Sequence, residues 1–151
     1  MSAIIEDTRQ QAGKHEQKHK YFEAEGVEII RSKLPVGDYA LAPSVSVDTK
    51  AGLHEIAANL CGDVAERQRF IRECKAARAL GCELVILIEN GKYKEPRDLI
   101  GREIKLKSGR TIKGEQLFRA MEITAARYGV RFEFCKPSES GRRIMEILRG
   151  S

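Results

Sequence analysis

The sequence predicts a single α/β domain, residues 1–151, in which a mixed central β-sheet is flanked by helices. Its clearest signal is the nearly continuous apolar run Glu83–Ile88, which is typical of a strand covered on both faces. Helical patterns precede and follow this run along the chain. A length of 151 residues also suits one domain with one hydrophobic core.

The first fifty residues carry short patterns of both strand and helix. In chain order we expect a strand at Ile4-Ile5 that closes on Asp7, a charged helix over 14–25 that ends at Gly26, a strand over 27–31, and one β-hairpin formed by 34–41 and 45–50. This hairpin is the place where we expect the functional residues to gather.

The rest of the chain continues the alternation of strands and helices. We expect four helices, each recognised by apolar residues at helical spacing, and a strand over 130–134 before the last of them. The second helix follows an N-cap at Asp63. In chain order, the apolar residues of the four helices are Leu53, Ile56, Ala57 and Leu60; Phe70, Cys74 and Ala77; Leu117, Met121, Thr124, Ala125 and Tyr128; and Ile144, Ile147 and Leu148. Residues 90–114 predict a mobile basic loop or a small hairpin that turns at Ser108-Gly109. Such a segment is either a solvated surface loop or a grip on a phosphate backbone.

Composition narrows the possible partners and the compartment. Lys and Arg number 27 against 22 Asp and Glu, and the net charge of +5 favours a polyanionic partner. No apolar run approaches the roughly 20 residues that span a bilayer, and the N-terminus has no signal-peptide pattern. We therefore expect a cytoplasmic protein with no membrane partner. The cysteines at 61, 74, 82 and 135 lack CxxC spacing, which predicts reduced thiols rather than disulfides or zinc ligands.

The candidate site rests on the alternation of residues 45–50. Val45, Val47 and Thr49 alternate with polar residues, so a strand would place Asp48 and Lys50 together on the opposite face. With Asp38 on the neighbouring strand, these groups can hold a divalent cation and a water beside a phosphodiester, as in a metal-dependent nuclease. Taken singly, each has an ordinary alternative, since Gly-Asp is common in turns and an Asp–Lys pair is common on surfaces.

A second motif, His15-Glu16-Gln17-Lys18-His19, has the H-E-x-x-H spacing of zinc proteases. Lysines crowd it, His54 is the only other histidine, and no downstream ligand pattern completes a zinc site. We interpret this stretch as an exposed charged helix.

Three short motifs resemble those of the XPF-type structure-specific endonucleases, whose domain is a variant of the restriction-endonuclease-like PD-(D/E)XK fold. The opening Asp7-Thr8-Arg9-Gln10 is similar to the family's Asp, Arg and Glu, with Gln10 in place of the Glu. Gly37-Asp38-Tyr39 is similar to its Gly-Asp followed by an aromatic residue. Asp48-Thr49-Lys50 stands where the family has Glu-Arg-Lys, and it keeps the acid and the lysine.

Softer similarities extend the resemblance over nearly the whole chain. The family's next acidic residue corresponds to Glu55, while strict spacing falls on His54. Its helical arginine corresponds to Arg69 in the stretch 67–70, and its closing strand with Pro-Ser corresponds to 132–138. The helix-hairpin-helix module of many members does not follow, so the chain resembles the compact stand-alone form of phages and bacteria.

The resemblance implies roles for individual residues. Asp38, Asp48 and the backbone carbonyl of Thr49 would bind Mg²⁺ or Mn²⁺, Asp7 would bind a second ion or tune the first, and Lys50 would orient the nucleophilic water. Arg9, Arg67 and Arg69 would contact phosphates, and His54 or Glu55 could join the site. The implied partner is branched, flapped or recombination-intermediate DNA, as in DNA repair and recombination.

Two alternatives keep the fold but change the role. One is a catalytically inactive DNA-binding or scaffold subunit, which the replacements at Gln10 and Thr49 favour and the retained Asp38, Asp48 and Lys50 oppose. The other is a Holliday-junction resolvase or a generic phage or restriction nuclease. The family commonly dimerises through this domain, so the apolar faces of the last two helices are either a homodimer interface or part of the core.

Overall fold

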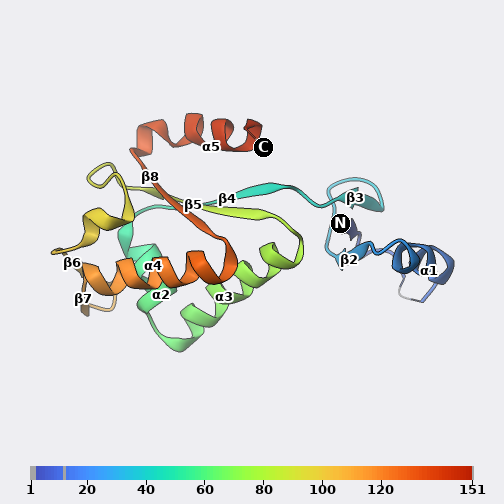
Figure 1. The fold of residues 1–151 in the computed structure, drawn as a ribbon, viewed down its shortest axis with the longest axis horizontal. Coiled ribbons are helices and arrows are strands. Elements are labelled where there is room, and N and C mark those ends of the chain that lie inside the picture. Colours follow the sequence, from blue (N-terminus) through green and yellow to red (C-terminus); the bar gives the residue numbers. More distant parts are fainter. Residues whose placement is uncertain (1–2, 12, 151) are drawn as a thin grey trace. The chain divides into compact units, whose positions relative to one another are not determined.

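The computed structural model describes residues 3–11 and 13–150 and shows an α/β protein (Figure 1). In chain order the elements are β1 (Ala3–Glu6), α1 (Glu16–Ala24), β2 (Glu28–Arg31), β3 (Tyr39–Leu41), β4 (Val45–Lys50), α2 (Leu53–Cys61), α3 (Val64–Ala79), β5 (Glu83–Glu89), the 3-10 helix η1 (Pro96–Leu99), β6 (Glu103–Lys105), β7 (Thr111–Lys113), α4 (Gly114–Tyr128), β8 (Arg131–Cys135), the 3-10 helix η2 (Pro137–Glu139) and α5 (Ser140–Arg149). The predicted α/β class and the predicted order of strands and helices are confirmed.

The chain falls into two compact units. The first comprises the residues up to Ser44 together with 79–82, and the second comprises 45–78 together with 83–151. The first unit contains a mixed sheet in the order β2-β1-β3, in which β1 is parallel to β2 and antiparallel to β3. Helix α1 ends before Gly26, whose φ of 71° lets the chain turn into β2.

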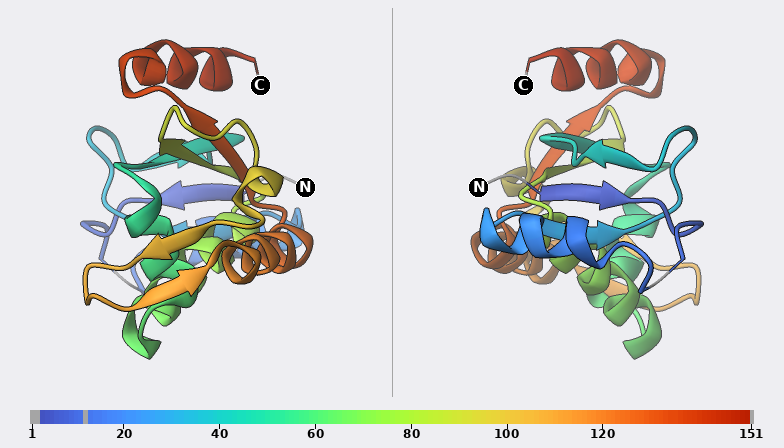
Figure 2. Two further views of the ribbon diagram at one scale, coloured as in Figure 1. Left: turned by 90° about the vertical axis from the view of Figure 1, so that its left-hand side faces the viewer. Right: turned by 90° about the vertical axis from the view of Figure 1, so that its right-hand side faces the viewer.

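The second unit is built on a parallel sheet in the order β4-β5-β8. Its central strand β5 is the predicted apolar run, and Leu84–Ile88 are each at most 4% exposed. Helix α5 lies on one side of this sheet, and α2, α3 and α4 lie on the other (Figures 1 and 2). Burial on both faces explains why β5 carries no alternation of polar residues.

Helix α3 begins as the sequence predicts. The Asp63 carboxylate accepts a hydrogen bond from the backbone N–H of Glu66 at 2.9 Å, which is the N-cap geometry of a side chain bonding a free first-turn donor. Phe70 and Cys74 are buried on the inner face of this helix, at 3% and 0% exposure. Cys61, Cys74 and Cys82 are buried, and Cys135 is half-buried.

Within residues 90–114, the structure has a small antiparallel hairpin, which is one of the two forms that we expected for this segment. β6 and β7 pair as antiparallel strands around a turn at Lys107-Ser108 and Gly109, which has a φ of 91°. The segment belongs to the core because its apolar side chains are buried. These are Tyr93, Leu99, Ile104, Leu106 and Ile112. The sequence pattern is hard to interpret here because single buried residues alternate with exposed lysines and arginines.

The expected β-hairpin of 34–41 with 45–50 is also wrong. β3 pairs with β1, and β4 pairs with β5 in a different sheet. A two-residue hairpin turn of the favoured types needs a positive φ, and none occurs over 38–50. β4 is instead drawn to the long apolar strand β5, where parallel pairing over six residues lets it join a buried sheet.

Among the described residues, no helix is both long enough and apolar enough to span a membrane.

Candidate active site

Strand β4 places an acid and a lysine side by side, as the alternation of its residues predicts. The ammonium of Lys50 lies 3.1 Å from a carboxylate oxygen of Asp48. The two side chains are 12% and 23% exposed, so the ion pair is largely withdrawn from solvent while remaining reachable. Partial burial strengthens the electrostatic interaction and restricts the geometry of the pair.

Helix α3 covers this ion pair with an apolar and an acidic side chain. The Lys50 ammonium lies 5.6 Å from the centroid of the buried Phe70 ring, a cation–π distance. One turn along α3, the Glu73 carboxyl shares a hydrogen bond with Asp48. Lys50 is therefore held between an aromatic ring and a pair of carboxyl groups.

Glu73 is the functional candidate that sequence reasoning missed. Much of Glu73 is exposed, but its carboxyl group is partly dehydrated. This dehydration raises the pKa of Glu73 to about 7, and the hydrogen bond and charge of Asp48 add to the rise. The positive charge of Lys50 acts in the opposite direction. Two carboxyl groups that share a proton near neutral pH are a suitable place for a cation, which relieves the same repulsion. The sequence indicated Glu73 only through its position. Glu73 stands three residues after Phe70 and next to Cys74, and these two residues are buried on the inner face of α3.

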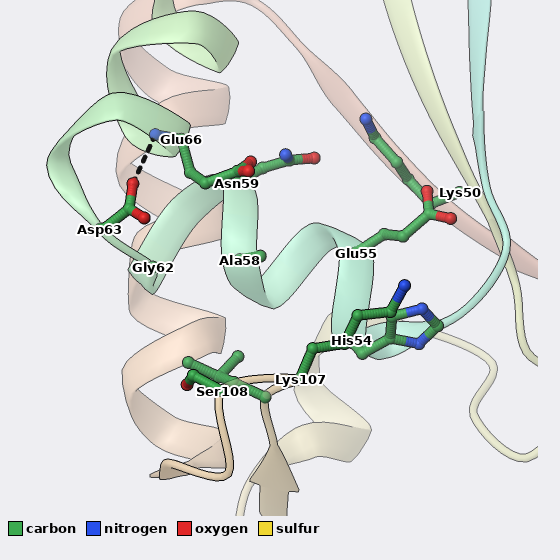
Figure 3. A pocket seen from close by; sticks show the side chains of 11 residues that line it. Lys50, His54, Glu55, Ala58, Asn59, Gly62, Asp63, Glu66, Lys107 and Ser108 are labelled. Carbon is green, nitrogen blue, oxygen red and sulfur yellow. Dashed lines mark hydrogen bonds between the residues drawn. The ribbon is translucent and has the colours of Figure 1, made fainter.

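Beside Lys50 a cavity of about 430 Å³ opens between α2, the start of α3 and the turn of the β6–β7 hairpin (Figure 3). His54 and Glu55, the two alternatives for one family position, both line it together with Lys50. The structure therefore brings both residues to the same wall, because they are consecutive in the first turn of α2. The remaining polar lining comes from Asn59, Asp63, Glu66, Lys107 and Ser108.

In the first unit, the backbones of Asp7 and Asp38 lie next to each other. The backbone N–H of Asp7 donates a hydrogen bond of 2.8 Å to the carbonyl oxygen of Asp38. The Asp7 side chain is 1% exposed, forms an ion pair with Arg9, and accepts a 3.3 Å hydrogen bond from the backbone N–H of Leu34. Burial raises the pKa of Asp7, but these donors outweigh burial and hold it below its ordinary value.

The same unit contains a cavity of about 540 Å³ that both acids line. Arg9 and Gln10 contribute to its wall, and so do Gln11, Lys14, His15 and Gly37. Asp38 is exposed, whereas Asp7 is buried, so the two carboxylates offer one solvent-facing and one sequestered set of oxygens. Four residues of the resemblance therefore meet at one cavity.

The H-E-x-x-H stretch is engaged in structural contacts. His19 lies 2.7 Å from the Glu6 carboxylate, which also accepts a 2.9 Å hydrogen bond from the Tyr39 hydroxyl and pairs with Arg31 at 3.2 Å. Burial raises the pKa of Glu6, but these partners hold it below its ordinary value. Among residues 3–11 and 13–150, no three His, Cys, Asp or Glu side chains are grouped as a metal site.

The other predicted phosphate contacts lie on the outer surface of α3. Arg67 and Arg69 are both exposed, and Arg69 pairs with Glu66 at 3.3 Å. Arg67 lies beside Arg72 and Lys75 along a second cavity wall, apart from the one that Lys50 lines. Thr49 is exposed on β4. The candidate acids thus belong to two groups, Asp7 with Asp38 in the first unit and Asp48 with Glu73 in the second.

Comparison with known proteins finds one matching family and two similar solved structures. Residues 6–145 match a family described as the ERCC4 domain. Two solved structures of XPF from Aeropyrum pernix are similar at 20% identity: the complex with DNA (TM-score 0.47, 99% of this chain, 64% of that one) and XPF alone (TM-score 0.48, 97% and 60%). The chain thus spans less than two thirds of the length of these structures. No curated protein matches its sequence.

Proposed function

Since this chain belongs to the ERCC4 domain family, we propose that it is a divalent-metal-dependent DNA endonuclease that cuts branched or flapped DNA. The observation that carries the proposal is the Asp48–Lys50 pair on one face of β4, joined by the Glu73 carboxyl. An acid that can bind a divalent cation and a lysine beside it can together support metal-assisted phosphodiester hydrolysis. The pair is partly buried and borders a cavity, so a substrate can reach it.

The donor set suits a hard cation. In the second unit, Asp48 and the Thr49 carbonyl would hold Mg²⁺ or Mn²⁺, with Glu73 as an additional oxygen donor beside Asp48. In the first unit, Asp7 and Asp38 are a separate pair of carboxylates that would bind the same kind of cation. Such an ion, when bound, supplies Lewis-acid stabilisation of the phosphoryl group. Carboxylate and carbonyl oxygens match the preference of Mg²⁺.

Basic side chains of both units would orient the water and bind the DNA. Lys50, held between Asp48 and the Phe70 ring, orients the nucleophilic water and offsets the charge that develops on the phosphate. Arg9, Arg67 and Arg69 have exposed guanidinium groups and would bind the DNA backbone. A fixed ammonium in a partly dehydrated site is worth more than the same charge in water, because nothing has to reorganise as the reaction proceeds.

A second copy of the chain is the protein partner that the family resemblance implies. Ile123 on α4 and Met145 on α5 are 50% and 44% exposed. Ile147, in contrast, packs into the protein at 5% exposure. Part of the apolar surface of the last helix therefore completes the fold, and the exposed part is available for association.

The test is cleavage of labelled duplex, flap, splayed-arm and four-way-junction DNA with Mg²⁺, Mn²⁺ or a chelator. We expect metal-dependent cutting that is strongest on branched DNA and falls by at least about a hundredfold in Asp48→Asn and in Asp38→Asn. Glu122→Gln removes one exposed negative charge from α4 and serves as the matched control, which should cut like wild type. The double variant Asp38→Asn/Asp48→Asn should be no slower than the slower single variant if the two acids act as a unit.

Absence of cutting by the wild-type protein on every substrate, with DNA binding retained, would overturn the proposal. That result would favour an inactive DNA-binding subunit of the same family, as the replacements at Gln10 and Thr49 allow. Cutting of four-way junctions alone would instead favour a resolvase.

A further inference from the structure

We propose that the cavity beside Lys50 receives one unpaired nucleotide of the substrate, and that this pocket makes the protein select branched DNA over intact duplex. The inference rests on the proposed nuclease function and adds the chemical class that one subsite recognises. It also gives the β6–β7 hairpin, whose role the sequence left open, a specific task. The argument depends on the size of the cavity, the distribution of its polar groups and its rigidity.

The size of the cavity suits a single nucleotide. Its volume of about 430 Å³ falls within the range of small-molecule binding pockets. A base stacked inside a duplex has to leave the stack and lose its pairing before it can enter a pocket of this kind. A nucleotide already unpaired at a branch or flap enters without the cost of breaking a base pair. Selection of branched DNA follows from this difference in cost.

Polar side chains line the pocket at both of its ends (Figure 3). Lys50 and Lys107 line one part together with His54 and Glu55, and the two ammonium groups there can pair with a phosphate. Asp63 and Glu66 lie at the opposite part, at the start of α3. Carboxylate oxygens there can accept hydrogen bonds from the exocyclic amino group of a base.

Asn59 supplies the most specific feature of the pocket. Its side-chain oxygen is buried and has no hydrogen-bond partner among the described residues, while the side chain points into the cavity from α2 (Figure 3). A buried acceptor without a partner is destabilising, and a ligand donor that reached the Asn59 oxygen would remove this cost. The amino group of adenine, cytosine or guanine is a donor that thymine lacks at the corresponding position.

The walls of the pocket are rigid before any DNA binds. The Arg110 guanidinium donates a hydrogen bond to the Cys61 carbonyl oxygen, which ties the hairpin to the end of α2. Leu106, which contributes an apolar part of the lining, is 6% exposed and belongs to the core, and its N–H donates a 2.8 Å hydrogen bond to the Arg110 carbonyl. A preformed wall spares the cost of ordering a loop on binding.

The test is a thermodynamic cycle between the protein and the DNA, measured as metal-free binding by fluorescence anisotropy. Flap DNA carries either an intact cytidine or an abasic residue at successive positions next to the branch. Ala58→Phe fills the pocket from α2, and Ala76→Phe makes the same change on the exposed surface of α3 as the matched control. At one position we expect wild type and the control to bind the intact strand about tenfold more tightly than the abasic strand, and Ala58→Phe to bind both equally.

A second variant keeps the test decisive if Ala58→Phe does not fold. Asn59→Leu removes the unpartnered acceptor at similar volume, so its thermal stability should equal or exceed that of wild type. It should also lose an expected preference of about tenfold for cytidine over thymidine at the same position. Equal binding of intact and abasic strands by wild type at every position, or full discrimination by both variants in folded form, would overturn the pocket.

These measurements separate the pocket from the nuclease activity. Cutting without any base discrimination in binding would leave the nuclease standing and remove the pocket. Base discrimination that depends on Ala58 and Asn59, together with no cutting under any metal, would support the pocket and overturn the nuclease proposal.

Discussion

Replacing Gly114 with alanine should destabilise the second unit, because the first residue of α4 lies against the backbone of η1. A Cβ atom at this position would lie 1.7 Å from the Leu99 carbonyl oxygen and 3.1 Å from that of Arg102. Real Cβ atoms essentially never approach other heavy atoms within 3.0 Å, so the backbone at Leu99 or at α4 has to move. Neither can move freely, since Leu99 is fully buried in the core and Gly114 donates a 2.7 Å hydrogen bond to Arg102.

The magnitude follows from these contacts. Forcing an extra carbon into a packed site costs about 1–3 kcal/mol, and weakening the Gly114–Arg102 hydrogen bond adds about 1 kcal/mol. We therefore expect the free energy of unfolding to fall by about 2–4 kcal/mol. For a chain of this length that loss corresponds to a decrease in Tm of about 5–15 °C.

The assay is thermal and urea unfolding of wild type, Gly114→Ala and a matched control within the same unit. Gly141 lies in α5, and a Cβ there would meet no atom within 4 Å. Alanine at Gly141 should instead raise the free energy of unfolding by about 0.4–1 kcal/mol, because it restricts the unfolded chain. The reasoning would be refuted if Gly114→Ala unfolded within about 0.5 kcal/mol of wild type, or if the two alanine variants were destabilised equally.

Two further predictions concern the active site and the dependence on pH. Lys50→Ala should abolish cutting but lower DNA affinity by less than about tenfold, because one ammonium makes only one phosphate contact among several. Parallel cleavage assays and mobility-shift titrations test this prediction. Loss of DNA binding in the variant would contradict a role of Lys50 in chemistry. Arg143 donates hydrogen bonds of 2.7 and 2.8 Å to Glu133, and this partner, opposed by burial, holds the pKa of Glu133 below its ordinary 4.5. The stabilisation that the ionised Glu133 provides is therefore complete at pH values above 4.5, and it is lost as the pH falls through the pKa of Glu133 in the folded protein. In thermal unfolding between about pH 6 and pH 3, wild type should therefore lose more stability than Glu133→Gln.

Local patterns in the sequence were sufficient for much of the fold and for part of the site. The apolar run Glu83–Ile88 identifies the central strand because a strand covered on both faces has no room for polar side chains. Period-two alternation places Asp48 and Lys50 on one face of β4, where the structure finds their ion pair. These properties depend only on neighbours along the chain.

Partner choice between elements was decided by the tertiary structure alone. The sequence indicates that 39–41 and 45–50 are strands, but only the fold shows that β3 pairs with β1 and β4 with β5. In the sequence, Glu73 is not distinguishable from the other charged residues of its helix. Only the packing of α3 brings it to Asp48.

The pocket beside Lys50 has the same origin, because the wall that Lys107 and Ser108 provide stands more than fifty residues from Lys50 in the chain. Side-chain direction is set by local backbone geometry and can be predicted from the sequence. The neighbours that a side chain meets depend instead on how distant elements pack. Only the tertiary structure therefore shows that Glu73 contacts Asp48 and that a cavity lies beside Lys50.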